Sequence, residues 1–241
     1  MKALSLYAKR FLRGFYVFVM LLVMVQPTLG DTISWTNWMS ATPSNTGSAD
    51  GLISLDNLTT VSVHYSGEIF FAQTSGGIDY WNPTTPYISS DVSNAPSSTD
   101  IIALKGGSMT VNTITFSEAV VNPVMGIVSM GRTDAPVRYQ FDEAFDILSV
   151  GKGYWGDGTL TELTGNVVEG REGHGVIQFI GTYSSISWIA PDYESWHGFT
   201  VGTEDVQQPA SGTPEPATML MLGTGIIGLA GLRKKFYSRI I

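Results

Sequence analysis

Residues 60–67 read Thr-Val-Ser-Val-His-Tyr-Ser-Gly, and this stretch decides the fold class. Val61, Val63 and Tyr65 are separated by single polar residues, and a period of two is typical of a strand with one buried face. Gly67 then permits a turn into a second apolar run, Ile69–Thr74. The stretch therefore predicts a strand, a turn and a further strand.

Short alternating runs of this kind continue toward residue 202. They cover Ile101–Leu104, Met109–Phe116, Val124–Met130, Val137–Phe141, Phe145–Val150, Val176–Ile180, Ser185–Ile189 and Phe199–Gly202. Outside the two ends of the chain, no window of about a dozen residues has a helical period of 3.6. About ten strands separated by turn residues are typical of two packed antiparallel sheets. We therefore predict an all-β ectodomain over residues 31–202, an antiparallel β-sandwich or jelly-roll-like fold.

Three segments between the predicted strands and the C-terminal end have no apolar period. Ser40–Gly51 and Tyr80–Asp100 are rich in Ser, Thr, Asn, Pro and Asp, so we predict loops there. Thr203–Thr213 reads Thr-Glu-Asp-Val-Gln-Gln-Pro-Ala-Ser-Gly-Thr, which is typical of a flexible linker.

The first 30 residues have the pattern of a secretory signal peptide. The basic residues Lys2, Lys9, Arg10 and Arg13 precede an uncharged apolar segment, Phe15–Val25. Pro27 and small residues up to Gly30 follow, and this order predicts export by the Sec translocase with cleavage after Gly30. The alternative that remains open is an uncleaved N-terminal anchor. In either case the middle of the chain is exported.

The C-terminal end combines three features in a fixed order. Pro214-Glu215-Pro216 comes first, an uncharged apolar segment 217–232 follows, and Arg233-Lys234-Lys235 begins a basic tail, 233–241. As a helix, residues 217–232 would span about 24 Å of a ~30 Å hydrocarbon core, a difference that snorkelling basic side chains can bridge. We predict a transmembrane helix with its basic end on the cytoplasmic side. A buried helix of a soluble domain is the alternative.

This ending resembles the PEP-CTERM sorting signal of proteins exported by Gram-negative bacteria. The resemblance is carried by Pro214, Glu215 and Pro216 and by the cluster Arg233, Lys234 and Lys235, within a sorting segment that covers residues 214–241. It implies an inner-membrane precursor that an exosortase cleaves, and a mature protein on the cell surface or in the extracellular matrix. The family context of such signals is exopolysaccharide and biofilm production.

Residues 121–202 carry a second resemblance. The block begins at Val121-Asn122-Pro123-Val124, includes Glu172-Gly173-His174-Gly175, and ends at Phe199-Thr200-Val201-Gly202. It looks like the β-rich ectodomain of one group of PEP-CTERM proteins, a group without an assigned activity. The resemblance implies a fold and a destination and leaves the activity open.

The charge of the exported part excludes one class of partner. The chain has 13 basic and 21 acidic residues, but the segment 31–232 keeps only five of the basic ones and all of the acidic ones, a formal charge of −16. Such a surface repels phosphate backbones, so we expect no binding to nucleic acid. The chain has no cysteine, so a core without disulfides has to stabilise the exported domain.

No catalytic constellation is recognisable in the sequence. His64, His174 and His197 lie on separate segments, and there is no cysteine and no Gly-x-Ser-x-Gly motif. A glycosidase needs two carboxylates across a cleft, which the sequence cannot place. Asp142, Asp146 and Asp157 are candidate calcium ligands of an acidic exported sandwich, although no Asp-x-Asp-x-Asp loop is present. We predict no catalytic residue and no other cofactor.

Exposed aromatic residues are the candidates for ligand binding. Tyr154 and Trp155 lie in the glycine-rich stretch 151–158, and Trp196 follows a turn. Aromatic faces suit sugar rings when polar side chains nearby bind the hydroxyl groups. The alternative is that these aromatics anchor the core. We therefore expect a non-enzymatic exported protein that binds polysaccharide; an exported glycan hydrolase and a structural coat protein without a specific ligand are the alternatives.

Overall fold

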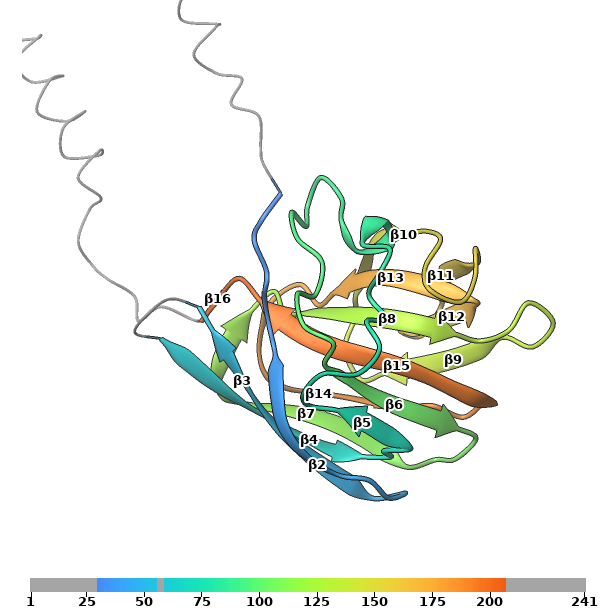
Figure 1. The fold of residues 1–241 in the computed structure, drawn as a ribbon, viewed down its shortest axis with the longest axis horizontal. Coiled ribbons are helices and arrows are strands. Elements are labelled where there is room, and N and C mark those ends of the chain that lie inside the picture. The colour runs from blue at the N-terminus through green and yellow to red at the C-terminus, as the bar shows by residue number, and fades with distance from the viewer. Residues whose placement is uncertain (1–29, 56–58, 207–241) are drawn as a thin grey trace, which may run out of the picture. The chain divides into compact units, whose positions relative to one another are not determined.

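The computed structural model of the protein describes residues 30–55 and 59–206 (Figure 1). The predicted signal peptide up to residue 29, most of the predicted linker and the sorting segment 214–241 lie outside the described residues. Within the described ranges, no helix is long and apolar enough to cross a membrane.

The described chain forms two antiparallel sheets, so the all-β prediction is confirmed. The seven-stranded sheet has the order β10 (Asp146–Val150), β13 (Gly173–Gln178), β8 (Val124–Met130), β15 (Tyr193–Thr203), β6 (Ile101–Gly106) and β5 (Phe71–Gln73), and β1 (Ser34–Trp35) also pairs with β15. The nine-stranded sheet has the order β11 (Thr159–Leu163), β12 (Val167–Arg171), β9 (Val137–Phe141), β14 (Thr182–Ile189), β7 (Val111–Val121), β4 (Thr60–Gly67), β3 (Gly47–Ser54) and β2 (Asn37–Thr42), with β16 (Asp205–Val206) paired to β7. A single 3₁₀ turn, η1 (Thr85–Tyr87), is the only helical element of the described residues.

The main core lies between the two sheets. In β4 the buried and exposed residues alternate strictly, so Val61, Val63 and Tyr65 point into this core as their spacing predicts. Tyr65 packs against Trp188 of the same sheet and against Phe199 of the opposite sheet, with ring centroids 5.9 and 5.3 Å apart. Fully burying each large side chain contributes roughly 1.5–3 kcal/mol, which supports a disulfide-free domain.

A second core covers the outer face of the seven-stranded sheet. Every residue of β8 is buried, because one face of the strand points into the main core and the other lies under the segment Tyr80–Asp100. Trp81 and Tyr87 of that segment pack edge to face with centroids 5.1 Å apart, and Trp81 Nε1 donates to the carbonyl of Asp100 over 3.1 Å. The segment contains no named strand, as predicted, but it is a packed cover of the sheet.

One predicted loop was wrong, and the structure places further strand residues beyond residue 202. The predicted loop Ser40–Gly51 forms β2, β3 and the turn between them, because small residues at the inward positions of β3 hide the alternation: a Cβ on Gly51 would come within 3.0 Å of the Trp38 ring. The folded unit also extends past residue 202. Thr203 ends β15, and Val206 of β16 pairs with β7 and is 7% exposed.

The strand register places the first and last described strands, β1 and β16, at the end of the sandwich opposite to the functional candidates. Gly173 pairs with Met130, and Tyr193 pairs with Gly106, so the turns 107–110, 131–136, 151–158 and 190–192 lie at one end, here named the loop end. Ser34 pairs with Thr203, and Asp205 pairs with Val121, at the other end of the strands. The described chain therefore begins and ends away from the loop end.

Candidate ligand-binding surface

Six aromatic side chains form a continuous row along the seven-stranded sheet and the loop end, here named the aromatic strip. Neighbouring ring centroids are 4.9–5.7 Å apart in the order Phe70, Phe71, Trp196, Tyr80, Tyr154 and Trp155. These separations are usual for interacting aromatic pairs. The structure thus brings together all three aromatic residues predicted for ligand binding.

The strip is assembled from four segments that are distant in sequence. Phe70 and Phe71 lie at the start of β5, Trp196 is in β15, and Tyr80 begins the segment over the second core. Trp196 and Tyr80 are half-buried, so these two rings also support the fold, as the alternative interpretation expected. Tyr154 and Trp155 remain 41% and 55% exposed. In contrast, Trp81, another loop aromatic, is fully buried in the second core.

The glycine-rich loop 151–158 holds Tyr154 and Trp155 by close backbone packing. A Cβ on Gly153 would overlap with Cγ and Nδ1 of His174. The loop is also closed by hydrogen bonds from the backbone N–H of Gly153 to the carbonyl of Gly156 (2.9 Å) and from Gly151 to the carbonyl of His174 (3.2 Å). The glycines therefore allow the loop to lie directly on β13, with its aromatic side chains turned outward.

His174 is the buried support of this loop. Its Nδ1 accepts a hydrogen bond from the backbone N–H of Ser129 over 3.3 Å and lies 3.2 Å from the hydroxyl of Tyr87. An accepting Nδ1 requires the neutral tautomer with the proton on Nε2. Burial lowers the pKa of His174 to about 4, because the charged form would lose its hydration. His174 is thus held as a neutral packing residue.

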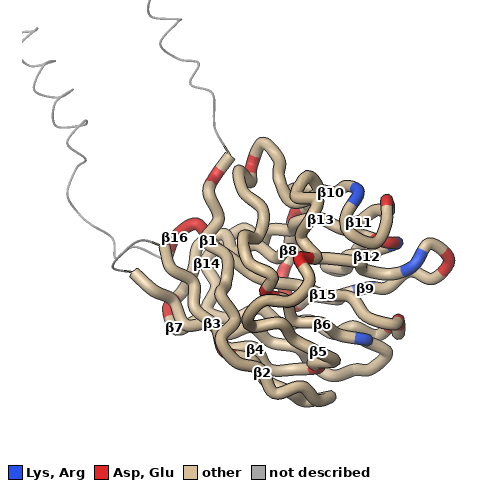
Figure 2. Tube along the Cα trace, viewed as in Figure 1, with Lys and Arg blue, Asp and Glu red and all other residues tan. Residues whose placement is uncertain are grey.

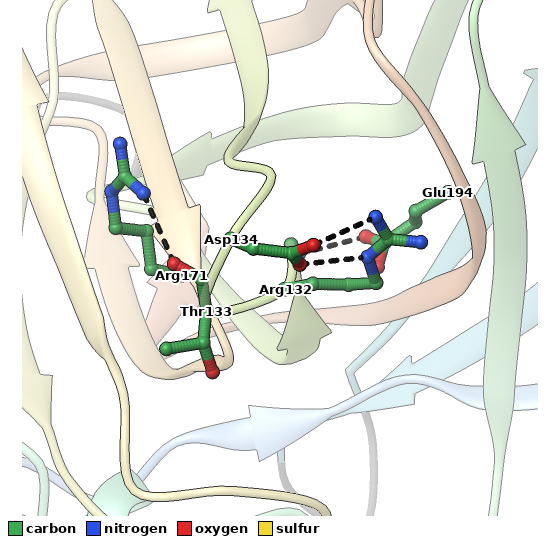
Figure 3. A network of polar contacts seen from close by, with 6 residues as sticks. Arg132, Thr133, Asp134, Arg171 and Glu194 are labelled. Atoms are coloured by element: carbon green, nitrogen blue, oxygen red, sulfur yellow. Dashed lines mark hydrogen bonds and ion pairs between the residues drawn. The ribbon is translucent and has the colours of Figure 1, made fainter.

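An open groove of about 350 Å³ lies beside Trp155, here named the Trp155 groove. Its lining combines the indole with hydroxyl and charged groups: Thr133, Trp155, Gly156, Asp157, Gly158, Thr159, Arg171 and Glu172. Arg171 donates from Nη1 to the carbonyl of Thr133 over 3.2 Å (Figure 3), and its Nε lies 3.5 Å from Oε1 of Glu169. The groove therefore places hydrogen-bonding groups of fixed position next to a half-exposed aromatic face.

The basic residues of the described ranges lie toward the loop end, near β6, β9, β10 and β12 (Figure 2). Arg132 binds Asp134 within the turn 131–136, with Nε 3.2 Å from Oδ1 (Figure 3). Glu194 fixes the start of that turn by accepting the backbone N–H of Gly131 over 2.8 Å. Arg138 makes a two-point contact with Asp192, at 2.7 and 2.8 Å, and the hydrogen bond and charge of this carboxylate raise the pKa of Arg138.

The candidate calcium ligands do not gather into one site. Asp142 accepts the backbone N–H of Ser187 over 2.9 Å, Asp146 begins β10, and Asp157 lines the Trp155 groove. In the described part of the chain, no three Asp, Glu or His side chains lie together as a metal-ligand group. The hydrogen bond to Ser187 gives Asp142 a structural role between β9 and β14.

The other two histidines lie on different strands, and each is next to a carboxylate. His64 is an exposed strand residue, as predicted, with Nδ1 2.7 Å from Oδ1 of Asp50 on the neighbouring strand. His197 is fully buried; its Nδ1 lies 2.7 Å from Oε1 of Glu194, and its ring lies 5.1 Å from that of Tyr139. Among the described contacts, each of these imidazoles lies beside a carboxylate and neither has a hydrogen bond to a serine or threonine hydroxyl.

Several members of this surface were not singled out in the sequence. Phe70, Phe71, Arg171 and Glu172 join it from β5 and from the end of β12. No sequence spacing connects them, because strand pairing between distant segments brings them together. The glycine-rich stretch around Tyr154 and Trp155, together with Trp196, was what indicated this surface in advance.

Fold and surface together define a protein whose described part forms two antiparallel sheets, with the exposed aromatic residues concentrated at the end opposite to β16. Residues 213–235 match the PEP-CTERM protein-sorting motif, so the chain carries the sorting signal of PEP-CTERM proteins. The motif implies an exported protein that is anchored in the membrane before an exosortase processes it. No curated protein and no solved structure gives a significant match to the chain.

Proposed function

We propose that the exported domain is a non-enzymatic polysaccharide-binding protein of the cell surface or extracellular matrix. The observation that carries the proposal is the aromatic strip, which ends in the exposed ring of Trp155 beside the polar Trp155 groove. The proposed route is Sec-dependent export from a Gram-negative cell, retention in the inner membrane by residues 217–232, and exosortase processing. The proposed setting is exopolysaccharide or biofilm.

The composition of the groove suits a sugar. The apolar C–H face of a pyranose stacks on an aromatic ring, while its hydroxyl groups need donors and acceptors in fixed directions. Trp155 offers the ring, and Asp157, Arg171 and the hydroxyl of Thr159 offer acceptors and donors around it. A ring that is 55% exposed leaves apolar surface uncovered in the free protein, and ligand stacking would bury it.

Binding without hydrolysis is favoured by the environment of the acids that line the Trp155 groove. Glu204, the described acid whose pKa is raised to about 7 by burial and Asp31, lies at the opposite end of the sandwich. A glycosidase requires a carboxylic acid that keeps its proton near neutral pH, which burial in an apolar pocket usually achieves. Asp157 is exposed, and Glu172 lies at the wall of an open groove. Asp142 and Asp146 are absent from the lining of this groove. These observations support a binding surface in preference to a catalytic cleft.

The experiment is a glycan array and affinity electrophoresis with residues 30–206. Trp155→Ala should lower polysaccharide affinity roughly tenfold, because truncating a stacking aromatic in a binding site typically costs about 1–2 kcal/mol. Tyr193→Ala is the matched control, because Tyr193 is 68% exposed at the same end but has no ring contact with the aromatic strip. Circular dichroism confirms that each variant is folded. Release of shortened glycans would assign a hydrolase, and silence across the array would favour a structural coat protein; either result overturns the proposal.

A further inference from the structure

Two lysines of the described domain have no carboxylate partner, and both are placed along the aromatic strip. Each of the three arginines forms an ion pair, Arg132 with Asp134, Arg138 with Asp192 and Arg171 with Glu169. Among the described residues, Lys105 and Lys152 are the remaining cations, and neither lies within 4.0 Å of a carboxylate oxygen. In a segment with this excess of acidic residues, unpaired ammonium groups next to an exposed ligand surface call for a functional explanation.

Lys105 marks one end of the strip. Its Nζ lies 3.8 Å from the ring centroid of Phe70, a cation–π contact that holds the ammonium group over the first ring. The nearby carboxylate of Glu68 is engaged elsewhere: it accepts the backbone N–H groups of Lys105 and Gly106, each over 3.0 Å. The backbone thus satisfies Glu68, and the ammonium group keeps its hydrogen-bonding capacity for a ligand.

Lys152 marks the other end. It is exposed in the glycine-rich loop, two residues before Tyr154 and three before Trp155. The loop backbone is held against β13 by the packing of Gly153 on His174, so the position of Lys152 is defined even though its side chain extends into solvent. A lysine without a carboxylate partner therefore stands near each end of the strip: Lys105 over Phe70, and Lys152 in the loop that carries Tyr154 and Trp155.

We infer that the strip binds an acidic polysaccharide, a chain of sugars with carboxylate substituents such as uronates. Aromatic rings between Phe71 and Trp155 contact the sugar rings, and Lys105 and Lys152 pair with carboxylates along the chain. The inference rests on the proposed function and adds the chemical class of the ligand.

The negative charge of the whole domain does not oppose this assignment at physiological salt. The Debye length is about 8 Å at 0.15 M ionic strength, so carboxylates at the far end of the sandwich are screened from a ligand at the loop end. Near the basic residues, Asp134 and Asp192 pair with arginines, and Glu68 accepts two backbone amides. Asp157 and Glu172 line the Trp155 groove without a basic partner within 4.0 Å, so the carboxylates of the ligand have to lie beside Lys105 and Lys152, outside that groove. The charges within contact distance of the strip therefore decide whether it prefers an acidic or a neutral polysaccharide.

The test compares acidic polymers with chemically matched neutral forms. The probes are polygalacturonate, alginate and hyaluronate, each with its methyl-esterified form, and residues 30–206 are titrated by isothermal calorimetry at 50 and 300 mM salt. The double variant Lys105→Gln/Lys152→Gln should weaken binding of an acidic polymer about tenfold at low salt, at roughly two- to fivefold per exposed ion pair, and leave the esterified form unchanged. Arg132→Gln/Arg138→Gln is the control, because it removes the same charge from ion-paired residues of the same end.

The outcomes separate this inference from the proposed function. Equal losses for acidic and esterified polymers, or equal losses for the lysine and arginine variants, would overturn the assignment of an acidic ligand while Trp155→Ala still weakens binding. If Trp155→Ala changes the affinity for no polymer, the proposed function itself fails. If none of the three acidic polymers binds, the inference is also overturned. The same holds if the protein binds vesicles of an anionic phospholipid through the two lysines and does not bind the polymers.

Discussion

Gly153 lies directly on the imidazole of His174, so closely that a Cβ at position 153 would overlap with the ring. His174 cannot move aside easily, because it is fully buried and its Nδ1 is held by the backbone of Ser129 and by Tyr87. The position of the glycine-rich loop, and with it the presentation of Tyr154 and Trp155, therefore depends on the close approach of the Gly153 backbone to the buried imidazole, together with the hydrogen bond from Gly151 to the carbonyl of His174.

Replacing Gly153 by alanine should disturb the surface and the fold together. The added methyl group must displace the loop or the imidazole, and overpacking of this kind costs about 1–3 kcal/mol of unfolding free energy. We expect a lower urea midpoint and weaker polysaccharide binding for Gly153→Ala. Gly151→Ala is the control in the same loop, because its Cβ would meet Pro86 at 3.5 Å, an ordinary van der Waals distance. Equal stability and equal affinity of the two variants would mean that the loop is not fixed by the contact with His174.

His174 should make stability depend on pH. The folded-state pKa is lowered to about 4, and an unfolded histidine titrates at about 6.5, so the unfolded chain binds the proton more tightly. The contribution of His174 to the free energy of unfolding is therefore complete above about pH 6.5. It decreases as the pH drops toward 4, by up to about 3 kcal/mol.

The measurement is urea unfolding of the wild type and of His174→Gln at pH 7.5, 5.5 and 4.5. The free-energy difference between the two proteins should shrink as the pH falls, because only the wild type loses the contribution of a neutral histidine. Burial and Asp31 raise the pKa of Glu204 to about 7, an effect of opposite sign, but both proteins share it and it cancels in the difference. A difference that stays constant with pH would contradict the assignment of a buried neutral imidazole.

The C-terminal boundary of the folded domain can be tested by truncation. Thr203 donates from its hydroxyl to the carbonyl of Val121 over 2.7 Å, and Val206 is buried where β16 pairs with β7. Ending the chain at Gly202 should therefore cost about 2–4 kcal/mol, from one buried valine and a few hydrogen bonds. Residues 30–206 should unfold in one cooperative transition with a β-type circular dichroism spectrum. Val206→Ala measures how much of this loss comes from the buried valine side chain. An unchanged urea midpoint after truncation would place the domain boundary at residue 202, as the sequence predicted.

The sequence predicted strands wherever large apolar residues alternate. β9 has the predicted bounds because Val137, Tyr139 and Phe141 alternate with exposed polar residues. β8 has the predicted bounds because its buried run lies between Pro123 and Gly131. β3 was not predicted because glycine and alanine occupy most of its inward positions. Trp38 and Thr36 fill the space that larger side chains would take there. β16 was not predicted because a strand of two residues is too short to show a period.

The candidate site was predictable only in part, for a related physical reason. Glycines around Tyr154 and Trp155 mark a place where the backbone lies close to another segment, and this signal is local. The partners of these residues arrive through strand pairing and through the segment over the second core, and long-range contacts leave no local period. The pairing of Lys105 with Phe70, 35 positions apart in the chain, is of this kind.

The last prediction concerns the sorting signal, which residues 213–235 carry. Pro214 and Pro216 lack backbone N–H groups, which disfavours incorporation of the motif into a helix or sheet, and Glu215 contributes the only charge between them. We expect an exosortase to recognise that carboxylate, so Glu215→Ala should accumulate as an uncleaved membrane-bound precursor in a host with the enzyme. Deleting Arg233–Lys235 should also block processing, because the basic cluster holds the segment at a constant depth in the membrane.

Mass spectrometry of membrane and surface fractions measures the outcome of both changes. Glu204→Gln, a carboxylate change outside the matched residues, is the control that should be processed normally. Because the ectodomain contains neither change, it should keep its fold and its glycan affinity in both variants. A Glu215→Ala protein that reaches the surface cut near Pro214 would show that the carboxylate is not what the exosortase reads.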